Sequence, residues 1–293
     1  MMNRITKFSK NAYRTAMRSV SNQMTSPTYL MAELENIREQ VRKSYPADLA
    51  LSGYKVYSQN DEDGIIAAIF DTIGTGSTFL EIGVENGTEC NTHFLALKDW
   101  RGAWIEGSDE KCIEIENSLG GRTFPGRFKV IEAMVDRGNI SALYDEVTAF
   151  CGVKDLDFFS LDIDGNDLFV LDTLLDSGAR PAVICIEYNG KFPPPLAISV
   201  AYNAQRNWQH DDHFGASLQA FCDVLTRHRY KLITCNLTGA NGFFVREDLA
   251  HLFEDVTPSQ VWRVLRLDLC PLPAGHRASL GWLREAVNRP VGG

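Results

Sequence analysis

A short loop that contains acidic and glycine residues is the first stretch of this sequence suited to binding a ligand. Glu81 lies near the end of an apolar run, and Gly83 and Gly87 follow it four residues apart. Glycine lets the backbone approach a ligand without a clash from Cβ. Glu85 stands where the dinucleotide-binding fingerprint has its second glycine, and its charge would repel a pyrophosphate. The loop therefore favours a cationic ligand over a dinucleotide, although a strand–turn–helix that only needs glycine has the same pattern.

A second acidic residue, Glu106, ends the next apolar run. It follows Gly83 at close to the spacing of about 20 residues at which an acid meets ribose hydroxyls in doubly wound folds. A carboxylate there can accept two hydrogen bonds from a vicinal diol, whereas the alternative is an ordinary exposed strand-end glutamate. Ala133 and Met134 follow the third apolar run, where they could contact an adenine ring, although Met is more often part of a core.

Three further carboxylates come at the ends of the fourth and fifth apolar runs. Asp162 and Asp164 belong to the first of these runs, and Glu187 ends the second. Together they could hold a hard divalent cation through oxygen, and a cation there would lower the pKa of a substrate hydroxyl. The alternative is that one carboxylate binds a ligand ammonium group while the others cap the backbone. The spacing leaves both interpretations open.

The connection over residues 189–214 is about twice as long as connections in such folds usually are. It contains His210 and His213 beside Asp211 and Asp212. A long loop at the carboxyl edge of a sheet is where a substrate lid belongs. Either histidine, or Asp162 at the adjoining strand end, could act as a general base near neutral pH or as a metal ligand.

These residues need a sheet that places them on one edge. Short apolar runs predict strands at 78–82, 102–106, 127–132, 156–163 and 181–187, with helices near 89–99, 110–119, 139–150 and 167–177. A helix near 216–229 then precedes strands at 230–235 and 241–245, which must be antiparallel because their connection is so short. An earlier helix should begin at Asn60 as its N-cap and stop at Gly74. We expect an α/β fold with a doubly wound, seven-stranded and mostly parallel sheet, closed by an antiparallel C-terminal hairpin.

Composition narrows the class of protein further. The 293 residues carry a net charge of −9, which argues against sequence-independent binding to nucleic acid. Seven cysteines without a C-x-x-C pair suit a reduced, cytoplasmic location. Residues 1–50 form a basic leader and a helix, 51–256 the main domain, and 257–293 a helical extension. The leader is either a solvated tail or a basic helix that rests on the inner face of an anionic membrane.

With these motifs placed, the chain resembles the FkbM-like branch of the class I S-adenosylmethionine-dependent methyltransferases, a Rossmann-like family. The resemblance covers residues 57–246 and rests on the segments 58–64, 79–88, 161–167, 214–217 and 241–246. It implies that Gln59 and Asp63 lie near the methionine end of the cofactor. Asn166 and Asp167 depart from the pattern of the branch, which puts the role of Asp167 in doubt.

The resemblance implies O-methyl transfer (EC 2.1.1) to a hydroxyl of a sugar, a glycan precursor or a related small molecule, often in surface-polysaccharide biosynthesis. A looser analogy to metal-dependent sugar O-methyltransferases adds Mg²⁺ or Mn²⁺ at Asp162 and Glu187. Two alternatives remain. One is a non-catalytic nucleotide- or glycan-binding module, and the other is a nicotinamide dehydrogenase, which the missing glycine and the closing hairpin disfavour.

Overall fold

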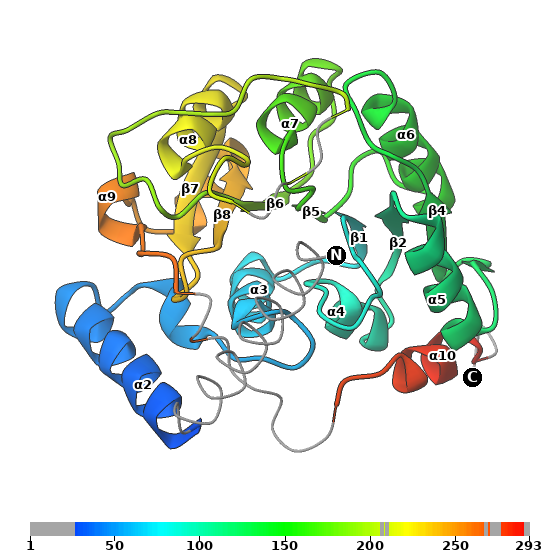
Figure 1. The fold of residues 1–293 in the computed structure, drawn as a ribbon, viewed down its shortest axis with the longest axis horizontal. Coiled ribbons are helices and arrows are strands. Elements are labelled where there is room, and N and C mark those ends of the chain that lie inside the picture. The colour runs from blue at the N-terminus through cyan, green and yellow to red at the C-terminus, as the bar shows by residue number, and fades with distance from the viewer. Residues whose placement is uncertain (1–26, 206–207, 209–210, 267–268, 270–276, 290–293) are drawn as a thin grey trace, which may run out of the picture.

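A computed structural model describes residues 27–205, 208, 211–266, 269 and 277–289 of the chain, and a single twisted sheet forms its centre (Figure 1). The strands run in the spatial order β3-β4-β2-β1-β5-β6-β8-β7. Their bounds are β1 Thr78–Ile82, β2 Arg101–Glu106, β3 Thr123–Phe124, β4 Phe128–Glu132, β5 Phe158–Leu161, β6 Val183–Glu187, β7 Tyr230–Cys235 and β8 Asn241–Arg246.

Helices cover both faces of this sheet (Figure 1). Alternate residues of β1 point to opposite faces, so Leu80 belongs to the core on the face that α6, α7 and α8 cover, whereas Phe79 belongs to the core on the face of α3, α4, α5 and α10. The helices are α2 Pro27–Ser44, α3 Glu62–Ile73, α4 His93–Leu97, α5 Asp109–Leu119, α6 Ile140–Cys151, α7 Asp167–Asp176, α8 Leu218–Arg227, α9 Pro258–Val261 and α10 Gly281–Val287, with 3₁₀ turns η1 Leu49–Ser52 and η2 Glu247–Leu252. Both faces are therefore buried, which explains why most residues of the central strands are apolar.

The topology confirms the predicted fold class. Strands β4, β2, β1, β5 and β6 pair in parallel, and the hairpin β7–β8 joins β6 in antiparallel pairing. This is the strand order of the class I methyltransferase sheet. The sheet has one more strand than predicted, because β3 adds two antiparallel residues beside β4. Among the described residues, no helix is both long and apolar enough to cross a membrane.

Two predicted helix starts are wrong, each for a physical reason. The helix predicted over 89–99 spans only His93–Leu97, because backbone N–H groups of Asn91 and Thr92 donate to the carboxylate of Glu81. Helix α3 begins at Glu62 rather than directly after Asn60, whose side-chain amide donates to Glu62. In both places a side-chain acceptor determines the local backbone.

The segments on either side of the main domain are joined through a buried ion pair. Asp48, just before η1, pairs with Arg263, which follows α9, and it also accepts a hydrogen bond of 2.6 Å from the Thr234 hydroxyl on β7. A buried carboxylate needs such partners, because its desolvation is costly. Pro258 is the first residue of α9, where its missing N–H is not needed by the helix. The basic residues of the predicted leader lie outside the described residues.

Candidate functional site

A cavity of about 620 Å³ lies at the carboxyl ends of the parallel strands. This edge is where ligands bind in open α/β sheets. Its lining combines strand ends, the loop after β1 and part of the long connection between β6 and α8. The lining residues include Gln59, Glu81, Gly83, Glu85, Glu89, Glu106, Ala133, Met134, Asp162, Asp164, Asn166, Glu187, Ala204, Trp208 and Asn241.

The two glycines after β1 are required by contacts within the protein. Gly83 has φ +85°, and a Cβ there would lie 1.6 Å from the carbonyl oxygen of Asp162. Gly87 has φ +77°, and its Cβ would lie 2.5 Å from the Trp104 ring. Gly83 lines the cavity and Gly87 does not. Close packing against β5 and β2 therefore already explains both glycines, without a ligand.

Glu81 lines the cavity but is already occupied with hydrogen bonds. Its two carboxylate oxygens accept from the backbone N–H of Asn91 and of Thr92, at 2.8 Å each, and one also accepts from the Thr92 hydroxyl. Burial raises the pKa of Glu81 to about 7, although these hydrogen bonds act to lower it. Glu81 thus holds the turn before α4 in place and presents a carboxyl edge to the cavity.

Glu106 lies where the sequence predicts a ribose-binding acid. One carboxylate oxygen accepts from the backbone N–H of Glu85 at 2.8 Å, and the other from that of Ser108 at 2.9 Å. A carboxylate has about four acceptor sites, so each oxygen keeps capacity for a ligand hydroxyl. The side chain is therefore held at the end of β2 with its remaining acceptor sites available to a diol.

Ala133 and Met134 form an apolar surface beside Glu106. The Ala133 N–H donates to the Glu106 carbonyl at 2.9 Å, which ties the chain after β4 to the end of β2. Met134 is 64% exposed, and its sulfur lies 2.3 Å from where a Cβ on Gly107 would be. A side chain that is exposed and polarizable, and that lies at a cavity wall, is suited to packing against a flat ring.

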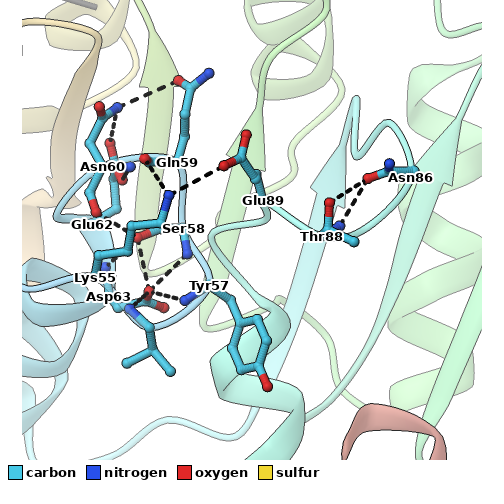
Figure 2. A network of polar contacts seen from close by, with 11 residues as sticks. Lys55, Tyr57, Ser58, Gln59, Asn60, Glu62, Asp63, Asn86, Thr88 and Glu89 are labelled. Atoms are coloured by element: carbon cyan, nitrogen blue, oxygen red, sulfur yellow. Dashed lines mark hydrogen bonds and ion pairs between the residues drawn. The ribbon is translucent and has the colours of Figure 1, made fainter. Parts of the chain in front are cut away.

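Gln59, just before α3, and Asp63, in its first turn, have different surroundings (Figure 2). Gln59 lines the cavity, whereas Asp63 does not. One oxygen of Asp63 accepts from the backbone N–H groups of Val56, Tyr57 and Ser58 at 2.7–2.8 Å, and burial raises its pKa. Asp63 therefore shapes the turn that carries Gln59 to the cavity rather than reaching the cavity itself.

Glu62, the first residue of α3, has a role that the sequence does not predict. Glu62 is fully buried, and one of its oxygens accepts from the side-chain amides of Asn236 at 2.6 Å and Asn241 at 2.9 Å. Both asparagines belong to the β7–β8 hairpin or its turn, and Asn241 lines the cavity. The signal in the sequence is the dense polar run 58–63, which is longer than one helix cap requires.

The three acids after β5 and β6 do converge, as the sequence predicts. One carboxylate oxygen from each of Asp162, Asp164 and Glu187 lies within 4.8 Å of the others. Burial, with the charges of Asp167 and Asp164, raises the pKa of Asp162 to about 8. Burial and the charge of Asp162 raise the pKa of Glu187 well above its usual range. The two carboxyl groups therefore interact directly, and each is harder to ionise than a free carboxyl group.

Asp167 fixes the loop after β5, which carries Asp162 and Asp164, through hydrogen bonds from the backbone of that loop. Its two oxygens accept from the backbone N–H groups of Ile163 and Gly165 at 2.8 Å each. Between them, Asp164 takes a positive φ of 55°, which is uncommon for a residue other than glycine. Oxygen donors that converge and are fixed from behind suit a hard cation such as Mg²⁺ or Mn²⁺.

The two histidines of the long connection do not both reach the cavity. His213 is exposed and is not among the described residues that line the cavity, and its backbone N–H donates to Asp211 at 3.0 Å. His210 lies outside the described residues. Catalysis by either histidine therefore stays a prediction. The adjoining Asp212 forms an ion pair with Lys191.

The side chains that line the cavity are strongly acidic. Among the described residues that line it, none is Lys, Arg or His. Seven of them carry carboxylates, namely Glu81, Glu85, Glu89, Glu106, Asp162, Asp164 and Glu187. Lys111 and Lys55 approach only the rim, at 3.3 Å from Glu85 and Glu89 respectively. Such a lining favours cationic or neutral ligands, because an anion would meet repulsion in a partly desolvated site.

No protein-family sequence model and no curated protein sequence matches this chain. Solved structures with a similar fold include an O-methyltransferase from Bacillus cereus in complex with SAH, with 16% identity, 73% of this chain and 89% of that chain covered, and a TM-score of 0.41. The N-terminal domain of EvdMO1 with SAH bound is 12% identical; the match covers 72% of this chain and 94% of that chain, with a TM-score of 0.40. TomG from Streptomyces achromogenes, an O-methyltransferase in complex with SAM, is 15% identical; the match covers 73% of this chain and 89% of that chain, with a TM-score of 0.39. Likeness at this level assigns no activity or substrate to the chain.

Proposed function

We propose that this protein transfers a methyl group from S-adenosylmethionine to a hydroxyl of a neutral sugar, a glycan precursor or a related small molecule. The observation that carries the proposal is the position of Glu106. It ends β2 beside the acid-and-glycine loop, in a sheet with the class I methyltransferase strand order. A diol-binding carboxylate at this point favours a nucleoside ligand.

The residues around Glu106 fit the other parts of that cofactor. Ala133 and Met134 supply an apolar surface for the adenine, and Gln59 and Glu81 line the far side, where the methionine part would lie. The carboxylates suit the sulfonium and ammonium charges of the ligand. When bound, S-adenosylmethionine would supply an activated methyl group, and its transfer to the acceptor oxygen would release S-adenosylhomocysteine.

The protein must then orient the acceptor and remove one proton. Asp162 lines the cavity, and its raised pKa makes its carboxylate a stronger base than usual, so it is the described side chain that we assign to accept a proton from an acceptor hydroxyl. If a divalent cation binds, Asp162, Asp164 and Glu187 would hold it, and the cation would make the hydroxyl more acidic. The acidic lining supports a neutral acceptor over a phosphorylated one.

Calorimetric titration with S-adenosylhomocysteine (SAH) tests the cofactor assignment. We expect micromolar binding to the purified, cofactor-free protein. Absence of binding, with or without Mg²⁺ or Mn²⁺, would exclude the methyltransferase proposal. Tight binding without methyl transfer to any hydroxyl acceptor would instead favour a non-catalytic binding module on the same fold.

The Asp162→Asn variant tests the metal part of the proposal. We expect Mn²⁺ binding, measured by calorimetry, to weaken at least tenfold in this variant because one of three oxygen ligands loses its charge. Asp172→Asn is the comparison variant, since Asp172 and Asp176 on α7 form, with His228 directly after α8, the other group of the described residues that could hold a cation, and this change leaves the cavity ligands intact. Equal Mn²⁺ affinity in wild type and Asp162→Asn would remove the metal from the proposed mechanism.

A further inference from the structure

The long connection between β6 and α8 forms one wall of the cavity, and a buried asparagine anchors its first half. Asn166, which follows β5 and lines the cavity, donates from its side chain to the Asn203 carbonyl at 2.8 Å. Its side-chain oxygen accepts from the Asn203 N–H at 3.2 Å. This paired hydrogen bond fixes Asn203, and the next residue, Ala204, lines the cavity.

A second buried asparagine anchors the other half of the connection. Asn189 follows β6 and is 1% exposed, and its side-chain amide donates to the carbonyls of Asp212 at 3.0 Å and Phe214 at 3.1 Å. Buried amide groups without partners are costly, so these bonds hold the connection against the strand ends. Both halves are thus fixed to neighbouring strands, β5 and β6.

Trp208 lies between these two anchors and lines the cavity. Its indole N–H donates to the Asp211 carbonyl at 2.7 Å, and its ring makes an edge contact with Phe214, with centroids 6.0 Å apart. These contacts orient the ring while leaving the side chain 39% exposed. Since the polar group of the indole is bonded within the connection, the ring offers mainly an apolar face to a ligand.

A cavity that is lined by both an aromatic face and carboxylates matches a particular ligand shape. Trp208 lines the same cavity as Asp164 and Glu187. A pyranose ring has one apolar face of C–H groups and an edge of hydroxyl groups. Its face can pack on an indole while its hydroxyls donate to carboxylates, which is how mostly apolar pockets combine with a few oriented polar groups.

We infer that Trp208 is the acceptor-binding platform of this protein and stacks on a neutral saccharide ring, with Asn166 as the positioning residue that holds its wall. The inference rests on the proposed function and adds the residue that selects the acceptor. It also separates the cavity into two parts. The end of β2 binds the cofactor, and the wall of the long connection binds the acceptor.

Saturation-transfer NMR on the SAH-loaded protein tests this assignment, with methyl glycosides of neutral hexoses and 6-deoxyhexoses as probes. We expect at least one glycoside to bind, and Trp208→Ala to weaken its affinity at least tenfold while the SAH affinity changes less than twofold. Trp282→Ala is the control, because Trp282 is 63% exposed on α10 and does not line the cavity. Asn166→Ala should raise the acceptor KM more than it lowers kcat.

Two results would overturn the assignment while leaving the cofactor site intact. One is that SAH binds but no glycoside does. This result counts equally if catechol, added as an aromatic diol for comparison, does bind. The other is equal glycoside affinity in wild type and Trp208→Ala. Loss of SAH binding in the wild-type protein would instead show that the proposed function itself is wrong, and the acceptor assignment would fail with it.

Discussion

The two halves of the cavity treat their carboxylates differently. At the ends of β1 and β2, Glu81 and Glu106 accept hydrogen bonds from backbone N–H groups, and Glu81 also accepts from a threonine hydroxyl. At the ends of β5 and β6, Asp162 and Glu187 instead hydrogen-bond each other. The first pair is held by donors within the protein, whereas the second pair places two carboxyl groups against each other.

This difference shows how one sheet edge can serve two ligands. Carboxylates fixed by backbone donors keep one geometry whether or not a ligand is present, which suits a cofactor site. Two neighbouring carboxyl groups with raised pKa can accept a proton from a substrate or bind a metal ion, which suits the site of reaction. The division follows the strand order. Strands β2 and β1 are neighbours, and β5 and β6 continue the sheet on the other side of β1.

The contact that joins the two halves gives the largest expected effect. Gly83→Ala should lower the free energy of unfolding by about 3–5 kcal/mol or prevent folding, because the new Cβ would overlap the Asp162 carbonyl. Gly126→Ala is the control, since Gly126 also has positive φ but nothing lies within 4 Å of its Cβ position. It should lose about 1 kcal/mol. Similar losses for both in urea unfolding would contradict the packing explanation.

Substitution of Glu106 tests the cofactor half alone. Glu106→Ala should weaken SAH binding at least tenfold in calorimetry, because the ribose loses a charged acceptor. Glu132→Ala is matched to it, since Glu132 ends the neighbouring strand β4 but does not line the cavity. Unchanged SAH affinity in Glu106→Ala would remove the ribose assignment.

The smallest expected effect concerns pH and Glu81. The folded state raises the pKa of Glu81 to about 7, so the folded protein holds a proton that the unfolded chain has released between pH 4.5 and 7. Stability therefore falls as pH rises through this window, by about 1–3 kcal/mol from this group.

The Glu81→Gln variant isolates that effect. Its absolute stability should be lower, because a glutamine amide nitrogen cannot accept the hydrogen bonds of Thr92. Its stability should nevertheless change less than wild type between pH 5 and 7.5 when followed by urea unfolding. Parallel pH profiles for the two proteins would contradict the raised pKa.

Much of the fold was predictable from local pattern. Predicted strands 78–82 and 230–235 have the observed bounds, because each is an apolar run that ends at polar residues. The convergence of Asp162, Asp164 and Glu187 was also predictable, since parallel strands end at one edge. The short strand β3 was not, because two residues carry no detectable period.

Roles within the site were harder to predict than positions. Asp63 and Gln59 belong to one sequence motif, yet only Gln59 reaches the cavity, because three backbone N–H groups turn toward Asp63. Asn166 reads as a departure from a family pattern, but its side chain pairs with Asn203. A sequence gives the donors and acceptors without showing which of them bond each other.

The sequence by itself determined the order of strands and helices along the chain and the edge of the sheet at which acidic residues gather, because these follow from the periodicity of apolar residues and the lengths of connections. The tertiary structure decided which acids remain available to ligands. That choice depends on contacts between distant segments, such as Gly83 against Asp162 and Glu62 against Asn241. Each of these contacts requires two backbones to meet at a fixed distance, and no local pattern specifies that distance.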